Sequence, residues 1–160
     1  MSTELEELYQ EVILDHSRRP RNFGALENAD VLVHGDNPSC GDEIHLGVHF
    51  GPNDTLAEIK FSGQGCAISQ ASASMMTMKL KGKTRSEASA LGNAFKELVT
   101  SSLSSSFATS SSQSPKLGDL QFLAGVRKFP QRVKCAMLPW RAVEQALAET
   151  RGESTVSTEL

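Results

Sequence analysis

The sequence lacks several features that would assign it to a specialised class of protein. Its 160 residues contain no apolar run close to the roughly 20 residues that span a bilayer, so we expect no membrane span. Basic residues are not in excess, since 16 Lys and Arg against 19 Asp and Glu give a net charge of −3. This balance argues against a nucleic-acid partner, which would need a concentrated basic face. The acidic first residues contain no apolar signal region, so we expect a cytoplasmic protein.

Cysteine is also scarce, and its pattern is informative. The chain has three cysteines, an odd number, and no C-x₂-C pair of the kind found in zinc fingers. A chain of this length forms a core without disulfides, so the cysteines indicate a reducing compartment and either thiol chemistry or metal binding. Their spacing alone leaves three inert buried cysteines as an open alternative. None lies within an apolar periodic stripe, however, and this favours a functional role.

Alternating apolar residues predict a small antiparallel sheet of three strands, over residues 31–34, 43–50 and 55–61. In the second strand Ile44, Leu46 and Val48 fall on one face. In the third, the alternation places Ala57 on the buried face and Leu56 on the polar face.

Helical spacing predicts the remaining elements. Two T-x-x-E capping boxes, at Thr3 and at Thr84, open helices over about residues 4–15 and 85–99. A third helix starts near Cys66; we expect its serines to keep its bulk low and its methionines, Met78 included, to fill the core. Further helices are expected over residues 117–126 and after Cys135, with Pro139 in the first turn of the last one.

These elements together predict an α+β fold in which an N-terminal helix and several C-terminal helices pack on the sheet. We expect a single domain over residues 1–148. It is interrupted at about residues 100–115 by a Ser-rich insertion to which no secondary structure is assigned, and it is followed by a polar, disordered tail over residues 149–160.

We expect a metal-binding site where the three cysteines and one carboxylate meet. Cys40 lies in a Pro- and Gly-containing loop two residues before Asp42, and Cys66 and Cys135 lie at expected helix starts, which stabilise thiolates. Three thiolates and one carboxylate would form a closed tetrahedral set for Zn²⁺. Bound to a divalent ion they carry a charge of −2, which the nearby Arg132 and Lys134 could offset.

The roles of the four histidines and of the arginines near residue 20 are less clearly indicated by the sequence. His45 and His49 share the polar face of the second strand, but no third ligand is apparent nearby, so surface histidines are the favoured interpretation. His16 and His34 show no pattern. The arginines of residues 18–21 fit either a solvated surface or a docking patch for an acidic partner.

Three segments resemble a known family, the U-type iron–sulfur cluster assembly proteins, and in particular their SufU branch. The segments are NPSCGD at residues 37–42, GQGCAISQASAS at 63–74 and KFPQRVKCA at 128–136, and they occur in the family's order. The resemblance also takes in the first helix and the RPRN stretch at residues 19–22, so it covers about residues 5–148.

The resemblance implies roles for individual residues. It implies Zn²⁺ ligation by Cys40, Asp42, Cys66 and Cys135, persulfide acceptance by Cys40 and an assisting role for Arg132. The implied activity is a zinc-dependent sulfurtransferase that takes sulfur from a SufS-type cysteine desulfurase and serves downstream iron–sulfur assembly proteins.

The alternative within the family is an IscU-like scaffold that assembles an iron–sulfur cluster and transfers it to apo-proteins. That branch has a histidine before the third cysteine and a shorter segment between the second and third cysteines. Here the histidine position is Lys134, and the segment carries the SufU-like insertion, so both features favour the sulfurtransferase. A third possibility is a purely structural zinc domain.

Overall fold

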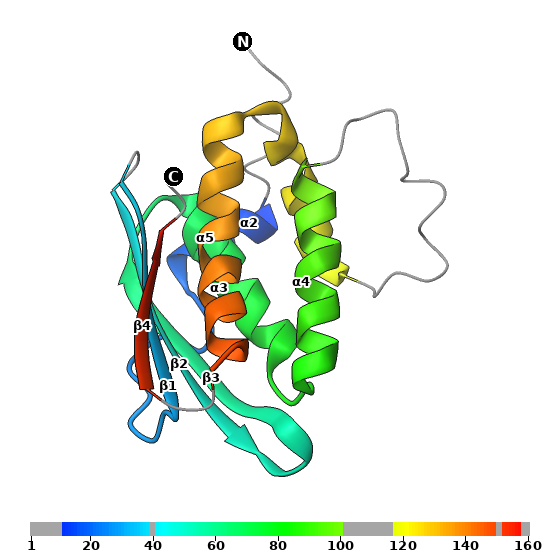
Figure 1. Ribbon diagram of the computed structural model, residues 1–160. Helices are drawn as coiled ribbons and strands as arrows, with labels where there is room; N and C mark the ends of the chain where they lie inside the picture. Colours follow the sequence, from blue (N-terminus) through cyan, green and yellow to red (C-terminus); the bar gives the residue numbers. More distant parts are fainter. Residues whose placement is uncertain (1–10, 39–40, 101–116, 150–151, 158–160) are drawn as a thin grey trace.

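The computed structural model describes residues 11–38, 41–100, 117–149 and 152–157. They form an α+β fold in which the helices pack on one face of a single four-stranded sheet (Figure 1). Among these residues, no helix is long and apolar enough to cross a membrane.

The sheet has one strand more than the sequence predicted. Its strands are β1 (Val31–Asn37), β2 (Asp42–Gly51), β3 (Thr55–Gln64) and β4 (Gly152–Ser157), in the order β3-β2-β1-β4. The first three are antiparallel, as expected, but β4 lies parallel to β1, so the sheet is mixed. The expectation of a disordered tail is therefore wrong for Gly152–Ser157. Val156, which packs against Gly35, is the one apolar residue of this strand. The strand was not predicted because its sequence does not alternate between apolar and polar residues.

The second strand follows the predicted alternation, but the third does not. Ile44, Leu46 and Val48 are all buried, which confirms the period of two in β2. In β3, Leu56 is fully buried and Ala57 is only half-buried, the reverse of the prediction. The pairing shifts between His49 and Phe50, because an irregularity leaves one residue of β3 without an opposite partner. A bulge of this kind reverses the faces of the residues beyond it.

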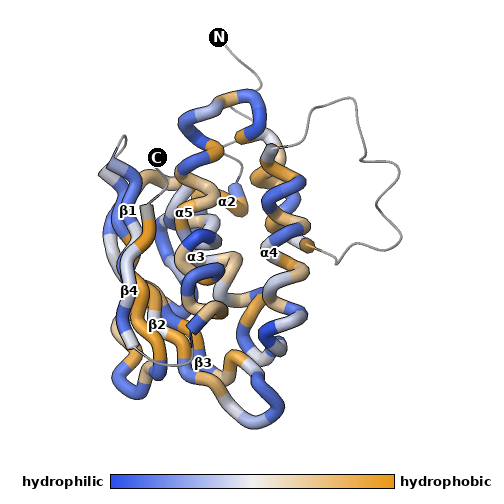
Figure 2. The backbone as a smooth tube through the Cα atoms, in the orientation of Figure 1, coloured by the Kyte–Doolittle hydropathy of each residue, from blue (hydrophilic) through white to orange (hydrophobic). Residues whose placement is uncertain are grey.

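The helices confirm most predicted positions. They are α2 (Glu11–Arg18), α3 (Ala67–Leu80), α4 (Arg85–Thr100) and α5 (Pro130–Leu147), with 3₁₀ segments η1 (Pro52–Asp54) and η2 (Gly118–Lys128). The capping box of α4 is present: the Thr84 N–H donates to Glu87 Oε1 (3.0 Å) and the Glu87 N–H donates to Thr84 Oγ1 (3.1 Å). Apolar residues of both the sheet and the helices form the core (Figure 2).

Other helical predictions need correction. The segment expected as a helix over residues 117–126 is the 3₁₀ segment η2. Met78 is 55% exposed, so only Met75 and Met76 of the three methionines fill the core. The last helix begins at Pro130 rather than after Cys135, because a proline that cannot continue a helix is well suited to start one. Pro139 consequently lies inside α5, where it has no N–H to donate to the carbonyl of Cys135.

Candidate metal and thiol site

Asp42, Cys66 and Cys135 converge on one point. Asp42 begins β2, Cys66 caps the N-terminus of α3 and Cys135 lies in the second turn of α5. One ligand atom from each residue, a carboxylate oxygen or a sulfur, lies within 4.8 Å of the other two. The structure thus brings together three of the four residues proposed as ligands, although Cys135 arrives from within a helix and not from a helix start. Cys40 lies outside the described residues.

The link between Asp42 and Cys66 is direct. The Asp42 carboxylate is 2% exposed, its Oδ1 accepts a hydrogen bond from the Cys66 backbone N–H (2.9 Å), and its Oδ2 lies 3.8 Å from Cys66 Sγ. Gly65 permits this approach, since a Cβ there would stand 2.9 Å from Asp42 Oδ1 and would clash with Ser69 Oγ. The glycine before Cys66 is therefore a steric requirement of the site.

A buried serine holds α5 against α3 beside Cys135. Ser72 Oγ donates to the Ala136 carbonyl (2.7 Å) and accepts from Trp140 Nε1 (3.2 Å). Trp140 in turn stacks on Phe95 of α4, with ring centroids 4.9 Å apart. The sequence pattern predicted only that the serines of α3 keep the bulk of the helix low. A hydroxyl within an apolar helical stretch was the signal for this contact, because a buried hydroxyl requires a partner.

The two thiols have opposite proton affinities. The pKa of Cys66 is lowered to about 6, chiefly by a hydrogen bond from the Cys135 thiol and also by hydrogen bonds from Ser69, while burial and the Asp42 charge oppose the shift. The same hydrogen bond, together with burial and the negative charges of Cys66 and Asp42, raises the pKa of Cys135. The hydrogen bond between the two sulfurs therefore favours the thiolate form at Cys66 and the protonated form at Cys135. A thiolate beside a carboxylate is a ready ligand pair for a divalent cation.

Arg132 and Lys134 lie in the first turns of α5, and both are half-buried. Arg132 precedes Cys135 by three residues, a spacing that places two side chains on the same face of a helix. Charge compensation by these two residues remains a prediction.

The basic loop that follows α2 makes ion pairs within the chain. Arg21 and Arg19 both reach Asp15, at 2.7 Å and 3.3 Å. The Arg21 backbone N–H donates to Ser74 Oγ (2.8 Å), which also bonds His16 Nδ1 (2.7 Å), so the loop is anchored on α3. Two of the arginines that could form a docking patch are thus paired with a carboxylate of the preceding helix α2.

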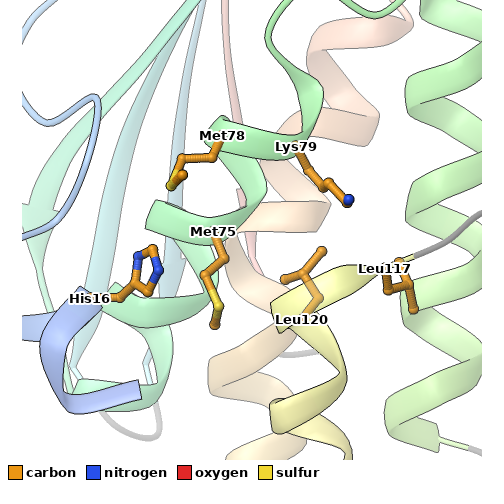
Figure 3. A pocket seen from close by; sticks show the side chains of 6 residues that line it. All are labelled: His16, Met75, Met78, Lys79, Leu117 and Leu120. Atoms are coloured by element: carbon orange, nitrogen blue, oxygen red, sulfur yellow. The ribbon is translucent and has the colours of Figure 1, made fainter. Parts of the chain in front are cut away.

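A separate hollow has a volume of about 330 Å³, and Figure 3 shows the side chains that line it. It is lined by α2, α3 and the start of η2, through His16, Met75, Met78, Lys79, Leu117 and Leu120. Met75 follows Cys66 by nine residues, which is about 14 Å along a helix. No sequence pattern predicted this hollow, and Asp42, Cys66 and Cys135 are not among the residues that line it.

The fold and the Asp–Cys–Cys group agree with the comparison to known families. The model of the NifU-like N-terminal domain matches residues 8–136, and the chain belongs to this family. The expected membership is thereby confirmed.

Individual relatives place the chain among SufU- and IscU-type proteins. It is 41% identical to the zinc-dependent sulfurtransferase SufU of Bacillus subtilis, over 92% of this chain and 95% of that protein. It is 42% identical to the iron–sulfur cluster assembly scaffold protein IscU of Streptococcus pyogenes, over 91% of this chain and 86% of that protein.

A crystal structure of a putative SUF-system scaffold protein from Fervidobacterium islandicum has the same fold. The TM-score is 0.75 at 36% identity, with 88% of this chain and 96% of that one covered.

Proposed function

We propose that this chain is a zinc-dependent sulfurtransferase that accepts persulfide sulfur from a SufS-type cysteine desulfurase during iron–sulfur cluster assembly. The observation that carries the proposal is the convergence of Asp42, Cys66 and Cys135 within 4.8 Å. The 41% identity to a relative named as a zinc-dependent sulfurtransferase supports it.

The donor set fits Zn²⁺. Two sulfurs and a carboxylate oxygen are ligands that this borderline-soft ion accepts. Cys40, joined to Asp42 through Gly41 alone, would supply the fourth ligand. Bound Zn²⁺ would hold the sulfurs as thiolates and protect them from oxidation. Asp42 would keep its second role, accepting the Cys66 N–H and thereby orienting the start of α3.

In this proposal Cys40 is the nucleophile that accepts the sulfur. Its thiolate attacks the terminal sulfur of the persulfide on the desulfurase, so a new S–S bond forms to Cys40 and the S–S bond of the donor breaks. The donor cysteine leaves as a thiolate, and the step consumes no oxidant or reductant. Arg132, on the same helix face as Cys135, would stabilise the negative charge of the attacking Cys40 thiolate.

A desulfurase turnover assay tests this function. Adding the chain to a SufS-type desulfurase should stimulate turnover, and mass spectrometry should find one added sulfur on Cys40. The Cys40→Ala variant, with folding checked by circular dichroism, should give neither result. Undiminished stimulation by this variant would refute the assignment.

The second candidate is an IscU-like scaffold, favoured by the 42% identity to the Streptococcus pyogenes relative. Lys134 argues against it, because it occupies the position where the scaffold branch has a histidine, and an ammonium group is no metal ligand. Anaerobic reconstitution with iron and sulfide separates the two functions. A chromophore that passes to an apo-ferredoxin would establish the scaffold.

A further inference from the structure

Two histidines lie directly opposite each other on the outer face of the sheet. His34 of β1 and His45 of β2 are register partners, and their rings stack with centroids 4.6 Å apart and 16° between planes. Directly opposed residues of an antiparallel pair have Cβ atoms about 4.5–5.5 Å apart, so the strand register itself holds the two imidazoles together. The pattern of the sequence offered no reason to place His34 beside His45.

A carboxylate completes a three-ligand group. Glu43 precedes His45 by two residues and so lies on the same face of β2. One ligand atom from each of His34, Glu43 and His45 lies within 4.8 Å of the other two. Two imidazoles and one carboxylate are the protein ligands of many Zn²⁺ sites that keep an open position for water. Surface histidines were the favoured interpretation because no third ligand was apparent near His45 in the sequence. The pairing of β1 with β2 brings His34 beside His45 and so completes a group of three ligands with Glu43.

The charges around the group favour a cation. Asp36 of β1 is the register partner of Glu43, and like charges directly opposite each other destabilise a sheet. Glu153 of β4 lines a hollow of about 210 Å³ together with His34 and His45. Lys60 of β3, the register partner of Gly47, is the basic residue on the neighbouring strand. The described residues of this face thus place three carboxylates near the imidazoles.

We propose that His34, Glu43 and His45 bind one divalent metal ion of the first transition row, with Zn²⁺ as the fitting ion. Successive residues of a strand point to opposite faces, and Asp42 is buried while Glu43 is exposed. The ion would therefore lie on the other side of the sheet from the thiols. The proposal stands on its own and does not depend on the proposed sulfur transfer.

The chemistry of this position differs from that of the thiols. It has nitrogen and oxygen ligands, His45 and Glu43 are exposed, and water would complete the coordination. Such a site would exchange its ion with solvent more readily than the thiol site, since two of its three ligands are exposed whereas Asp42 and Cys135 are buried.

Nuclear magnetic resonance of the imidazole nitrogens tests the proposal on the full chain without any substitution. After one equivalent of Zn²⁺ has been added, a second equivalent should shift the ring resonances of His34 and His45 together and leave those of His16 and His49 in place. If the first equivalent already shifts His34 and His45, this site still stands and the thiol site is the one in doubt. Unchanged His34 and His45 resonances in excess Zn²⁺, or equal shifts at all four histidines, would overturn the proposal.

Calorimetric titration of Zn²⁺ into variants identifies the ligands. His34→Ala and Glu43→Gln should each weaken one binding event by at least about tenfold, the loss typical even for an outer-shell partner. His49→Gln is the matched control, since His49 lies on the same face of β2 but pairs with Asp30 at 3.1 Å. Glu43→Gln removes only an exposed charge, so it gives a result even if His34→Ala unfolds. Parent-like binding by the Glu43→Gln variant and by a folded His34→Ala variant would refute the site.

Discussion

Asp42 and Glu43 are neighbours in β2, yet they take part in two groups of opposite character. Asp42 faces inward to two sulfurs, accepts a backbone N–H and is 2% exposed. Glu43 faces outward to two imidazoles that only the register of β1 and β2 brings together. One strand can thus present a soft, buried donor set and a harder, exposed one on its two faces. Packing pre-organises the first group, and pairing alone forms the second.

The largest effect expected from this difference is in thiol reactivity. In metal-free protein, alkylation of Cys66 should follow a pH profile with a midpoint of about 6, because only the thiolate reacts and the pKa of Cys66 is lowered to that value. Reaction should slow as the pH falls through this midpoint. At pH 7, Cys135, with its raised pKa and full burial, should react more than about 100-fold more slowly.

Peptide mapping after timed alkylation measures both rates in one sample. Protein loaded with Zn²⁺ is the control, and its Cys66 should be protected. A midpoint near the ordinary value of 9.0 would show that Cys135 does not stabilise the Cys66 thiolate.

A smaller effect is expected from removing one charge on the inner face. Asp42→Asn keeps an oxygen that can accept the Cys66 N–H but loses the carboxylate ligand. Zn²⁺ affinity of the thiol site should fall by roughly 10–100-fold, measured by competition with a chromophoric chelator. Asp36→Asn, the same change on the outer face, is the control and should leave thiol-site affinity intact. Equal losses in both variants would mean that net charge, and not ligation, governs the affinity.

The smallest expected effect concerns the steric requirement at Gly65. Gly65→Ala should lower thermal stability by about 1–3 kcal/mol, the usual cost of overpacking, because its Cβ would crowd Asp42 Oδ1 and Ser69 Oγ. Gly92→Ala in α4 is the control, since a Cβ there meets Trp140 at 3.6 Å, an ordinary contact, and alanine favours a helix. Thermal unfolding of both variants measures the difference. A Gly65→Ala variant as stable as the parent would show that the approach of Asp42 to Cys66 tolerates a methyl group.

Local patterns predicted the parts of the fold that depend on neighbouring residues. The alternation of β2 and the capping box at Thr84 were both found as predicted, since each depends on residues only two or three apart. The position of Cys66 at the start of α3 was equally local.

Features that depend on contacts between residues far apart in the chain could not be predicted from local sequence patterns. Cys135 reaches the site through the packing of α5 on α3, with Ser72 as the link, and not through a helix start. The pairing of His34 with His45 requires the strand register, which no single strand reveals. The fourth strand was missed because its residues are polar and its stability comes from pairing with β1.

That fourth strand also changes which part of the sheet can meet other molecules. It pairs with β1 from Val31 to Asp36, and β1 leads directly into the connection that carries Cys40. Without β4, β1 would present a row of unpaired N–H and C=O groups on which the strand of a second molecule could add. The pairing of β4 therefore moves the free edge of the sheet from β1 to β4, and any strand that adds on this side would have to pair with Gly152–Ser157.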